Sequence, residues 1–152
     1  MDAASQLLKQ WSDHLQRLCQ EGFLDDQFLQ LKQLQDEDNP KFVVEVVSLF
    51  FDDSEKLLSN MAKALEEKVV DFKQVDAYVH QFKGSSASIG ALRLKNGCIN
   101  FRNYCETQNK EGCLRCLQQL KQECYVLKDN LKALFMLEQQ YVAAGGSISK
   151  LS

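Results

Sequence analysis

The run CLRCLQQLKQECYVLKDNLKALFMLEQQY, residues 113–141, decides the fold class. Apolar residues recur in it at alternating steps of four and three, a spacing that places them on one face of an α-helix. That face consists of Cys113, Leu117, Leu120, Cys124, Leu127, Leu131, Leu134, Glu138 and Tyr141. Glu138 is the single charge in it. A helix of this extent is about 43 Å long, and Gly145-Gly146 marks its end.

The residues upstream contain five more apolar stripes of helical spacing. Two short helices are predicted within residues 1–36, with Trp11 in the first stripe and Leu34 in the second. Three longer helices are predicted within residues 40–68, 72–89 and 94–105. Asn39 suits the N-cap of the first long helix, and Pro40 suits its first turn, where a backbone N–H is not needed.

These helices predict an all-α protein of one domain, residues 1–152, because the chain is long enough to bury one core. Short connections favour antiparallel neighbours, so we expect the last four helices, residues 40–142, to form an antiparallel up-and-down four-helix bundle. The first two helices, within residues 1–36, would pack on one end of it. Residues 143–152 would be a flexible tail.

Composition and charge narrow the function classes. The chain is 45% hydrophobic and 26% charged, which is ordinary for a folded protein, and its net charge is −3. Residues 1–70 carry −7 and residues 71–152 carry +4. An acidic chain without a Lys/Arg cluster argues against nucleic-acid binding. We find no apolar run long enough for a membrane span and no export signal, so we expect a protein of the cytosol or nucleus with six reduced cysteines.

His80 is the strongest candidate for chemistry. It belongs to the helix predicted after Asp71, where the core stripe includes Val75, Val79 and Phe82. At about 100° per residue, His80 lies about 130° from the core direction and therefore faces solvent. The other histidine, His14, has no distinctive neighbours, and we expect it to be structural or solvated.

The neighbours of His80 on the helix surface are small or cationic. Lys83 lies one turn away and can place an ammonium near an anion on the ring. Gly84 costs helix stability relative to alanine, and close approach by another surface would explain its presence. From the spacing alone, a surface histidine beside an incidental glycine remains an equal alternative.

The stretch Tyr78-Val-His-Gln-Phe-Lys-Gly-Ser-Ser-Ala-Ser-Ile-Gly-Ala91 resembles the phosphorylation-site helix of plant histidine-containing phosphotransfer (HPt) proteins, which act in cytokinin phosphorelays. Residues 96–106 and 111–120 also resemble that family. The resemblance implies a carrier that takes a phosphoryl group from the receiver-domain aspartate of a hybrid sensor histidine kinase and hands it to the receiver of a response regulator. It also implies a monomer found in cytoplasm and nucleus.

The resemblance assigns roles to residues of this helix. His80 would be the phosphoryl acceptor, Lys83 would offset its charge, and Gly84 would admit the receiver. The expected partner contacts are Asp76, Ala77, Gln81, Ala87 and Ser88. The chain itself would need no cofactor or metal, because this helix has no carboxylate cluster for Mg²⁺, and the receiver would supply that ion.

Two other function classes remain open. One is a helical adaptor that binds partners through the same face without being phosphorylated. The other is a thiol or metal enzyme that uses Cys113 and Cys116, although a closed zinc site needs four ligands and no second pair is present. Cys98, Cys105, Cys113 and Cys124 lie on predicted core stripes, which favours a role as small hydrophobes. Neither a P-loop nor a Gly-x-Gly-x-x-Gly pattern occurs, so we expect no ATP site and no autokinase activity.

Overall fold

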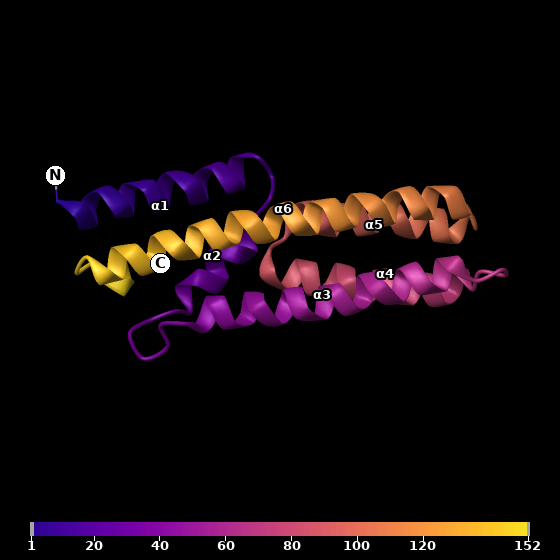
Figure 1. Ribbon diagram of the computed structural model, residues 1–152, viewed down its shortest axis with the longest axis horizontal. Coiled ribbons are helices and arrows are strands. Elements are labelled where there is room, and N and C mark those ends of the chain that lie inside the picture. The colour runs from indigo at the N-terminus through magenta and orange to yellow at the C-terminus, as the bar shows by residue number, and fades with distance from the viewer. Residues whose placement is uncertain (1, 152) are drawn as a thin grey trace.

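The computed structural model describes residues 2–151 and confirms the all-α prediction of six helices (Figure 1). The helices are α1 Ala3–Gln20, α2 Asp26–Gln33, α3 Phe42–Glu66, α4 Phe72–Ile89, α5 Leu92–Glu106 and α6 Lys110–Ala143, followed by the 3-10 helix η1 Ile148–Leu151. No helix within residues 2–151 is both long and apolar enough to cross a membrane.

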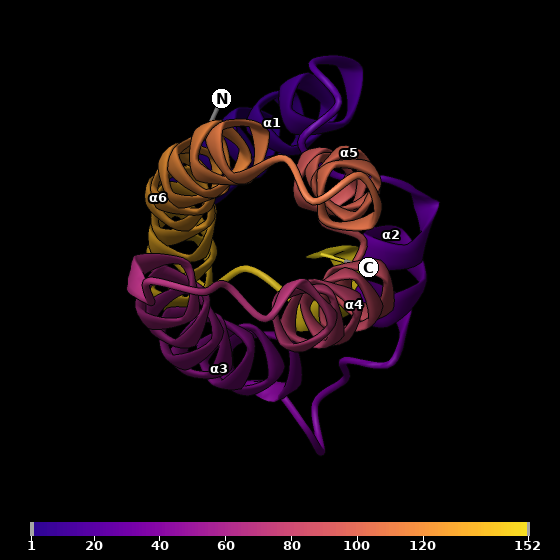
Figure 2. The ribbon, with the colours of Figure 1, turned by 90° about the vertical axis from the view of Figure 1, so that its right-hand side faces the viewer.

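Helices α3, α4, α5 and α6 form the predicted bundle. Viewed end-on, the four helices surround one core, and each packs against its two neighbours (Figure 2). Only two residues separate α4 from α5, and three separate α5 from α6, so successive helices run antiparallel. Buried side chains fill the centre, among them Phe50, Val79, Phe82, Phe101 and Leu117.

The apolar face predicted for residues 113–141 is buried along α6, apart from the half-buried Cys124. Its one charge, Glu138, is only 7% exposed and has two partners from the N-terminal helices. The indole Nε1 of Trp11 donates to Glu138 Oε1 at 3.0 Å, and the ammonium of Lys32, itself 2% exposed, pairs with the same carboxylate. Glu138, the charge that interrupts the apolar face, therefore joins α1 and α2 to α6.

Apart from their shared junction at Glu138, the two N-terminal helices pack against different helices. Helix α1 lies beside the C-terminal half of α6, whereas α2 packs against α4 (Figure 1). At the second junction, Asp25 N donates to Gly90 O at 3.0 Å. Gly90 ends α4 at φ +78°, and a Cβ there would collide with the backbone of Phe28. This glycine thus permits both the turn after α4 and the approach of α2.

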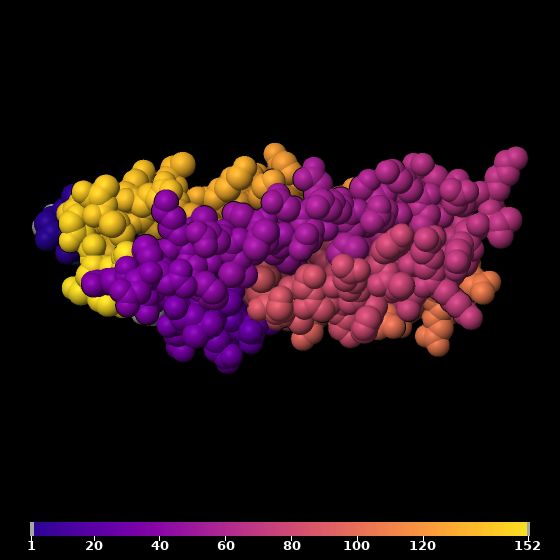
Figure 3. Space-filling model, turned by 90° about the horizontal axis from the view of Figure 1, so that it is seen from below, coloured from indigo at the N-terminus to yellow at the C-terminus, as the bar shows by residue number. Residues whose placement is uncertain are grey.

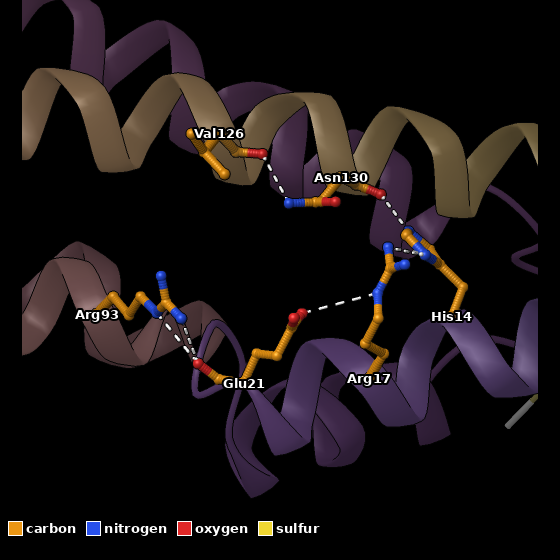
Figure 4. A network of polar contacts seen from close by, with 6 residues as sticks. All are labelled: His14, Arg17, Glu21, Arg93, Val126 and Asn130. Carbon is orange, nitrogen blue, oxygen red and sulfur yellow. Dashed lines mark hydrogen bonds and ion pairs between the residues drawn. The ribbon is translucent and has the colours of Figure 1, made fainter.

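His14 links α1 to α6 (Figure 4). Its Nε2 lies 2.9 Å from the carbonyl oxygen of Asn130, and its Nδ1 lies 3.1 Å from a guanidinium nitrogen of Arg17. A carbonyl can only accept and a guanidinium can only donate, so these contacts require the neutral ring with its proton on Nε2. Of the two roles expected for His14, structural or solvated, these contacts support the structural one.

Three local predictions differ from the structure. Leu34, placed on an apolar stripe, is 63% exposed because the buried face of α2 runs through Phe28 and Lys32. Asn39 and Pro40 do not begin the third helix, which starts at Phe42. Instead, the Asp36 side chain accepts from the backbone N–H groups of Asp38 and Asn39 and holds these residues in a turn. In the tail predicted to be flexible, η1 forms and Leu151 packs into the core at 2% exposure.

Candidate functional site

Helix α4 holds His80 near the middle of a rigid, well-capped segment. The Asp71 side chain accepts from Gln74 N at 3.2 Å and caps the N-terminus, while Gly90 closes the C-terminus. The stripe through Val79 and Phe82 is buried, so the opposite face reaches the surface, beside α3 in Figure 3. His80 is exposed on that face, as its position in the sequence predicted.

The most specific contact of His80 comes from another helix. Arg102, on α5, places Nη1 2.9 Å from His80 Nδ1. The same guanidinium binds Asp76 of α4 twice, with Nε 2.9 Å from Oδ1 and Nη2 3.2 Å from Oδ2. These hydrogen bonds to Asp76 raise the pKa of Arg102, so the guanidinium remains a permanent donor.

This contact determines the role of each ring nitrogen. A guanidinium has no acceptor, so Nδ1 of His80 must accept through its lone pair. The neutral ring then carries its proton on Nε2. No hydrogen bond from residues 2–151 reaches Nε2, and the exposure of the side chain leaves this nitrogen accessible to a partner.

Lys83 and Gly84 lie one turn beyond His80. Lys83 is half-buried and forms no ion pair within residues 2–151. Gly84 is exposed, and a Cβ built on it would meet no atom within 4 Å. Nothing in the protein itself therefore demands a glycine at position 84, which is consistent with a requirement for outside access.

An open groove of about 830 Å³ lies between α4 and α5, beside residues that contact or neighbour His80. Lys83, Asp76 and Arg102 line it, together with the apolar side chain of Ile99. Its charged lining consists of Asp71, Lys73, Asp76, Lys83, Arg102 and Glu106. Positive and negative groups are thus equally represented, and no group of three or more His, Cys, Asp and Glu side chains within residues 2–151 is arranged to hold a metal ion.

The predicted partner-contact residues divide into two groups. Ala77, Gln81 and Ser88 are exposed, and the half-buried Ala87 lies two turns from His80 on its side of the helix. Asp76 is instead engaged by Arg102. In this structure Asp76 holds the guanidinium of Arg102 against the ring of His80.

The cysteines are buried rather than poised for reaction. Cys98, Cys105, Cys113 and Cys116 lie in the core, and burial raises the pKa of all four thiols, that of Cys98 to about 12. A raised pKa lowers the thiolate fraction near neutral pH and with it nucleophilic reactivity. This environment weighs against the thiol enzyme considered for Cys113 and Cys116.

Arg102 is the site residue that sequence reasoning missed. It lies 22 residues from His80 and directly follows the buried Phe101, at the edge of the α5 stripe. Helical periodicity identifies which residues face the core, but it does not pair a polar residue of one helix with a polar residue of the next. No motif in the chain signals the contact.

Comparisons with known proteins find similar chains of one kind. The Hpt domain model matches residues 45–130. Histidine-containing phosphotransfer protein 1 of Arabidopsis thaliana is 59% identical over 92% of this chain and 91% of its own length. Histidine-containing phosphotransfer protein 5 of the same plant is 55% identical over 97% and 94%. A crystal structure of a histidine-containing phosphotransfer protein from Medicago truncatula superposes with a TM-score of 0.87 at 60% identity, covering 93% of this chain and 96% of that one.

Proposed function

Because the chain belongs to the Hpt family of histidine-containing phosphotransfer proteins, the phosphoryl carriers of plant two-component phosphorelays, we propose that His80 is its phosphoryl-accepting residue. The observation that carries this proposal is the exposed ring on α4, with Nδ1 engaged by Arg102 and Nε2 accessible. The donor would be the receiver aspartate of a hybrid sensor histidine kinase. The acceptor would be the receiver aspartate of a response regulator, in cytokinin signalling.

The transfer would take place at Nε2. In the donor's aspartyl phosphate the P–O bond breaks, a P–N bond forms to Nε2, and the carboxylate leaves with the electron pair. Attack needs a lone pair on Nε2, so the ring would first shift to the tautomer that carries its proton on Nδ1, and that proton would pass to solvent once the P–N bond has formed. Nδ1 would therefore release Arg102 for the attack and accept from it again in the neutral phosphohistidine. The reverse sequence delivers the phosphoryl group to the next aspartate.

The receiver would supply what the chain lacks for this reaction. We propose that Mg²⁺ is bound by the partner's carboxylates and that no ATP site or autokinase activity resides in this chain. The docking face would consist of Ala77, Gln81, Gly84, Ala87 and Ser88 around His80. We also propose that the protein acts as a monomer in both cytoplasm and nucleus, which sedimentation and a fluorescent fusion would test.

Transfer from a phosphorylated receiver domain tests the function directly. The purified chain is mixed with that domain and its intact mass is measured at neutral pH, since phosphohistidine is acid-labile. A carrier gains the mass of one phosphoryl group while the receiver loses it. Binding without any gain of mass would instead establish the non-phosphorylated adaptor.

We expect Lys83 to assist phosphoryl transfer through the positive charge of its ammonium group. Lys83→Ala is expected to slow transfer by roughly three- to tenfold at low salt, with a smaller deficit at high salt, because added ions screen the charge it opposes. Rapid-quench transfer assays at two ionic strengths measure this. Lys132→Ala, which removes an exposed ammonium from the distant half of α6, is the matched control. Equal rates for Lys83→Ala and the parent at both salt concentrations would remove Lys83 from the mechanism.

Substitutions at Gly84 should have opposite effects on the stability of the fold and on the rate of phosphoryl transfer. Gly84→Ala is expected to stabilise the fold by about 0.5–1 kcal/mol in urea, because alanine favours helix and the added Cβ meets no atom. Gly84→Gln should be at least as stable as the parent but transfer about 10- to 100-fold more slowly, because the side chain would displace the receiver from the ring. A destabilised Gly84→Gln with normal transfer would show that this glycine serves packing instead.

A further inference from the structure

The guanidinium of Arg102 is held by Asp76 as well as by its contact with His80. Two parallel hydrogen bonds to Asp76 fix the plane of its guanidinium, and the third nitrogen, Nη1, is then directed at His80 Nδ1. The Arg102 and Asp76 side chains are 36% and 33% exposed, so the pair is partly shielded from solvent. The arrangement spans α4 and α5, the pair of helices that packs most extensively together.

The state of Nδ1 controls the lifetime of a phosphoryl group on Nε2. In hydrolysis, a water oxygen bonds to phosphorus, the P–N bond breaks, and its electron pair stays on Nε2. If Nδ1 is protonated, the group that leaves is a neutral imidazole, and both protons of the water remain on the released dihydrogen phosphate. If Nδ1 is unprotonated, the ring must leave as an imidazolate, which is a far poorer leaving group.

We propose that Arg102, positioned by Asp76, prolongs the life of the phosphohistidine by occupying Nδ1 and opposing its protonation. The inference rests on the proposed acceptor role of His80. A guanidinium fits this task because it donates without being able to give up its proton near neutral pH. The carrier would thereby retain its phosphoryl group during the interval between two receivers.

No other charged group near His80 forms a hydrogen bond to its Nδ1 within residues 2–151. Lys83 and Asp76 are on α4, and Glu106 is further along α5 in the same groove. Helix α3 packs on the other side of α4, and no hydrogen bond or ion pair from α2, α3 or α6 to His80 occurs within residues 2–151. Asp76 by itself would favour a protonated ring, so its benefit depends on the arginine that it holds.

Chemical phosphorylation isolates the effect from the receiver. Phosphoramidate transfers its phosphoryl group to the imidazole nitrogen, and the displaced ring proton leaves with ammonia. The decay of the product is followed by ³¹P NMR between pH 4 and pH 9 in the full chain, with His80→Gln as the control that assigns the signal. Arg115→Gln, which removes an exposed guanidinium of α6, is the charge-matched control.

For Arg102→Gln we expect the pH profile of decay to move to higher pH, with the half-life at pH 7 shortened roughly three- to tenfold. At pH 4 all variants should decay alike, because every ring is then protonated. Arg115→Gln should follow the parent throughout. An unshifted profile for Arg102→Gln, or a loss of lifetime by the same factor at every pH, would overturn the proposal.

Asp76→Ala tests the positioning part separately. Removal of its charge alone would move the profile to lower pH, whereas release of Arg102 from the ring would move it to higher pH. For Asp76→Ala we expect the pH profile of decay to move to higher pH, by less than for Arg102→Gln. A move to lower pH would overturn the positioning role of Asp76. Failure of receivers to phosphorylate a chain with these shifted profiles would refute the proposed function without affecting this inference.

Discussion

His80→Gln is expected to abolish phosphoryl acceptance and leave the melting temperature nearly unchanged. The side chain is exposed and lies opposite the buried face that contains Val79 and Phe82, so the substitution removes no core packing. Its partner Arg102 keeps both hydrogen bonds to Asp76 and is not left unpaired. Intact mass at neutral pH after incubation with a phosphorylated receiver, together with a thermal melt followed by circular dichroism, measures both parts.

His14→Gln is the matched control, because His14 is the other histidine of the chain. Its ring is engaged by Asn130 and Arg17, so the change should weaken the junction of α1 with α6 while phosphoryl acceptance persists. Continued labelling of His80→Gln would assign the phosphoryl group to another residue. Loss of labelling in both variants would indicate that docking depends on the N-terminal helices.

The second large effect is expected at the buried pair of Lys32 and Glu138. Lys32→Met should destabilise the protein by about 3–5 kcal/mol, because it leaves the Glu138 carboxylate uncompensated in the core. Only the Trp11 indole would still donate to that carboxylate. The free energy of unfolding in urea, with its slope, measures the loss.

The double variant Lys32→Met/Glu138→Gln should recover most of that stability. The glutamine oxygen still accepts from Trp11, and no charge remains buried. Glu21→Gln provides the exposed comparison, since it breaks the pair of Glu21 with Arg17 at the surface and should cost about 0.5 kcal/mol or less. A cost for Lys32→Met as small as that of Glu21→Gln would contradict the buried-pair interpretation.

The sites of these two effects differ in how far the sequence reveals them. The exposure of His80 follows from its angle to Val75, Val79 and Phe82, all within one helix, and the structure agrees. Glu138 is conspicuous in the sequence as a charge on an apolar face, but its partners Trp11 and Lys32 lie 127 and 106 residues away. The sequence pattern therefore showed that a charge interrupts the apolar face, but it did not show which residues neutralise that charge.

Helix ends were the least predictable local feature. The turn at residues 36–39 depends on the Asp36 side chain bonding to its own backbone, which competes with the capping role expected of Asn39. Leu34 is exposed for a different reason, because the buried face of α2 runs through Phe28 and Lys32. Helical periodicity does not register the side-chain hydrogen bonds that form the turn at residues 36–39.

The sequence by itself determined the six helices, the buried face of every helix except α2, and the exposure of His80, because a period of three to four residues is a property of one local segment. Only the tertiary structure decided that Arg102 meets His80 and Asp76, and that Lys32 and Trp11 meet Glu138. Such contacts depend on the relative rotation and register of packed helices, which are set by the whole core rather than by any one stretch of chain.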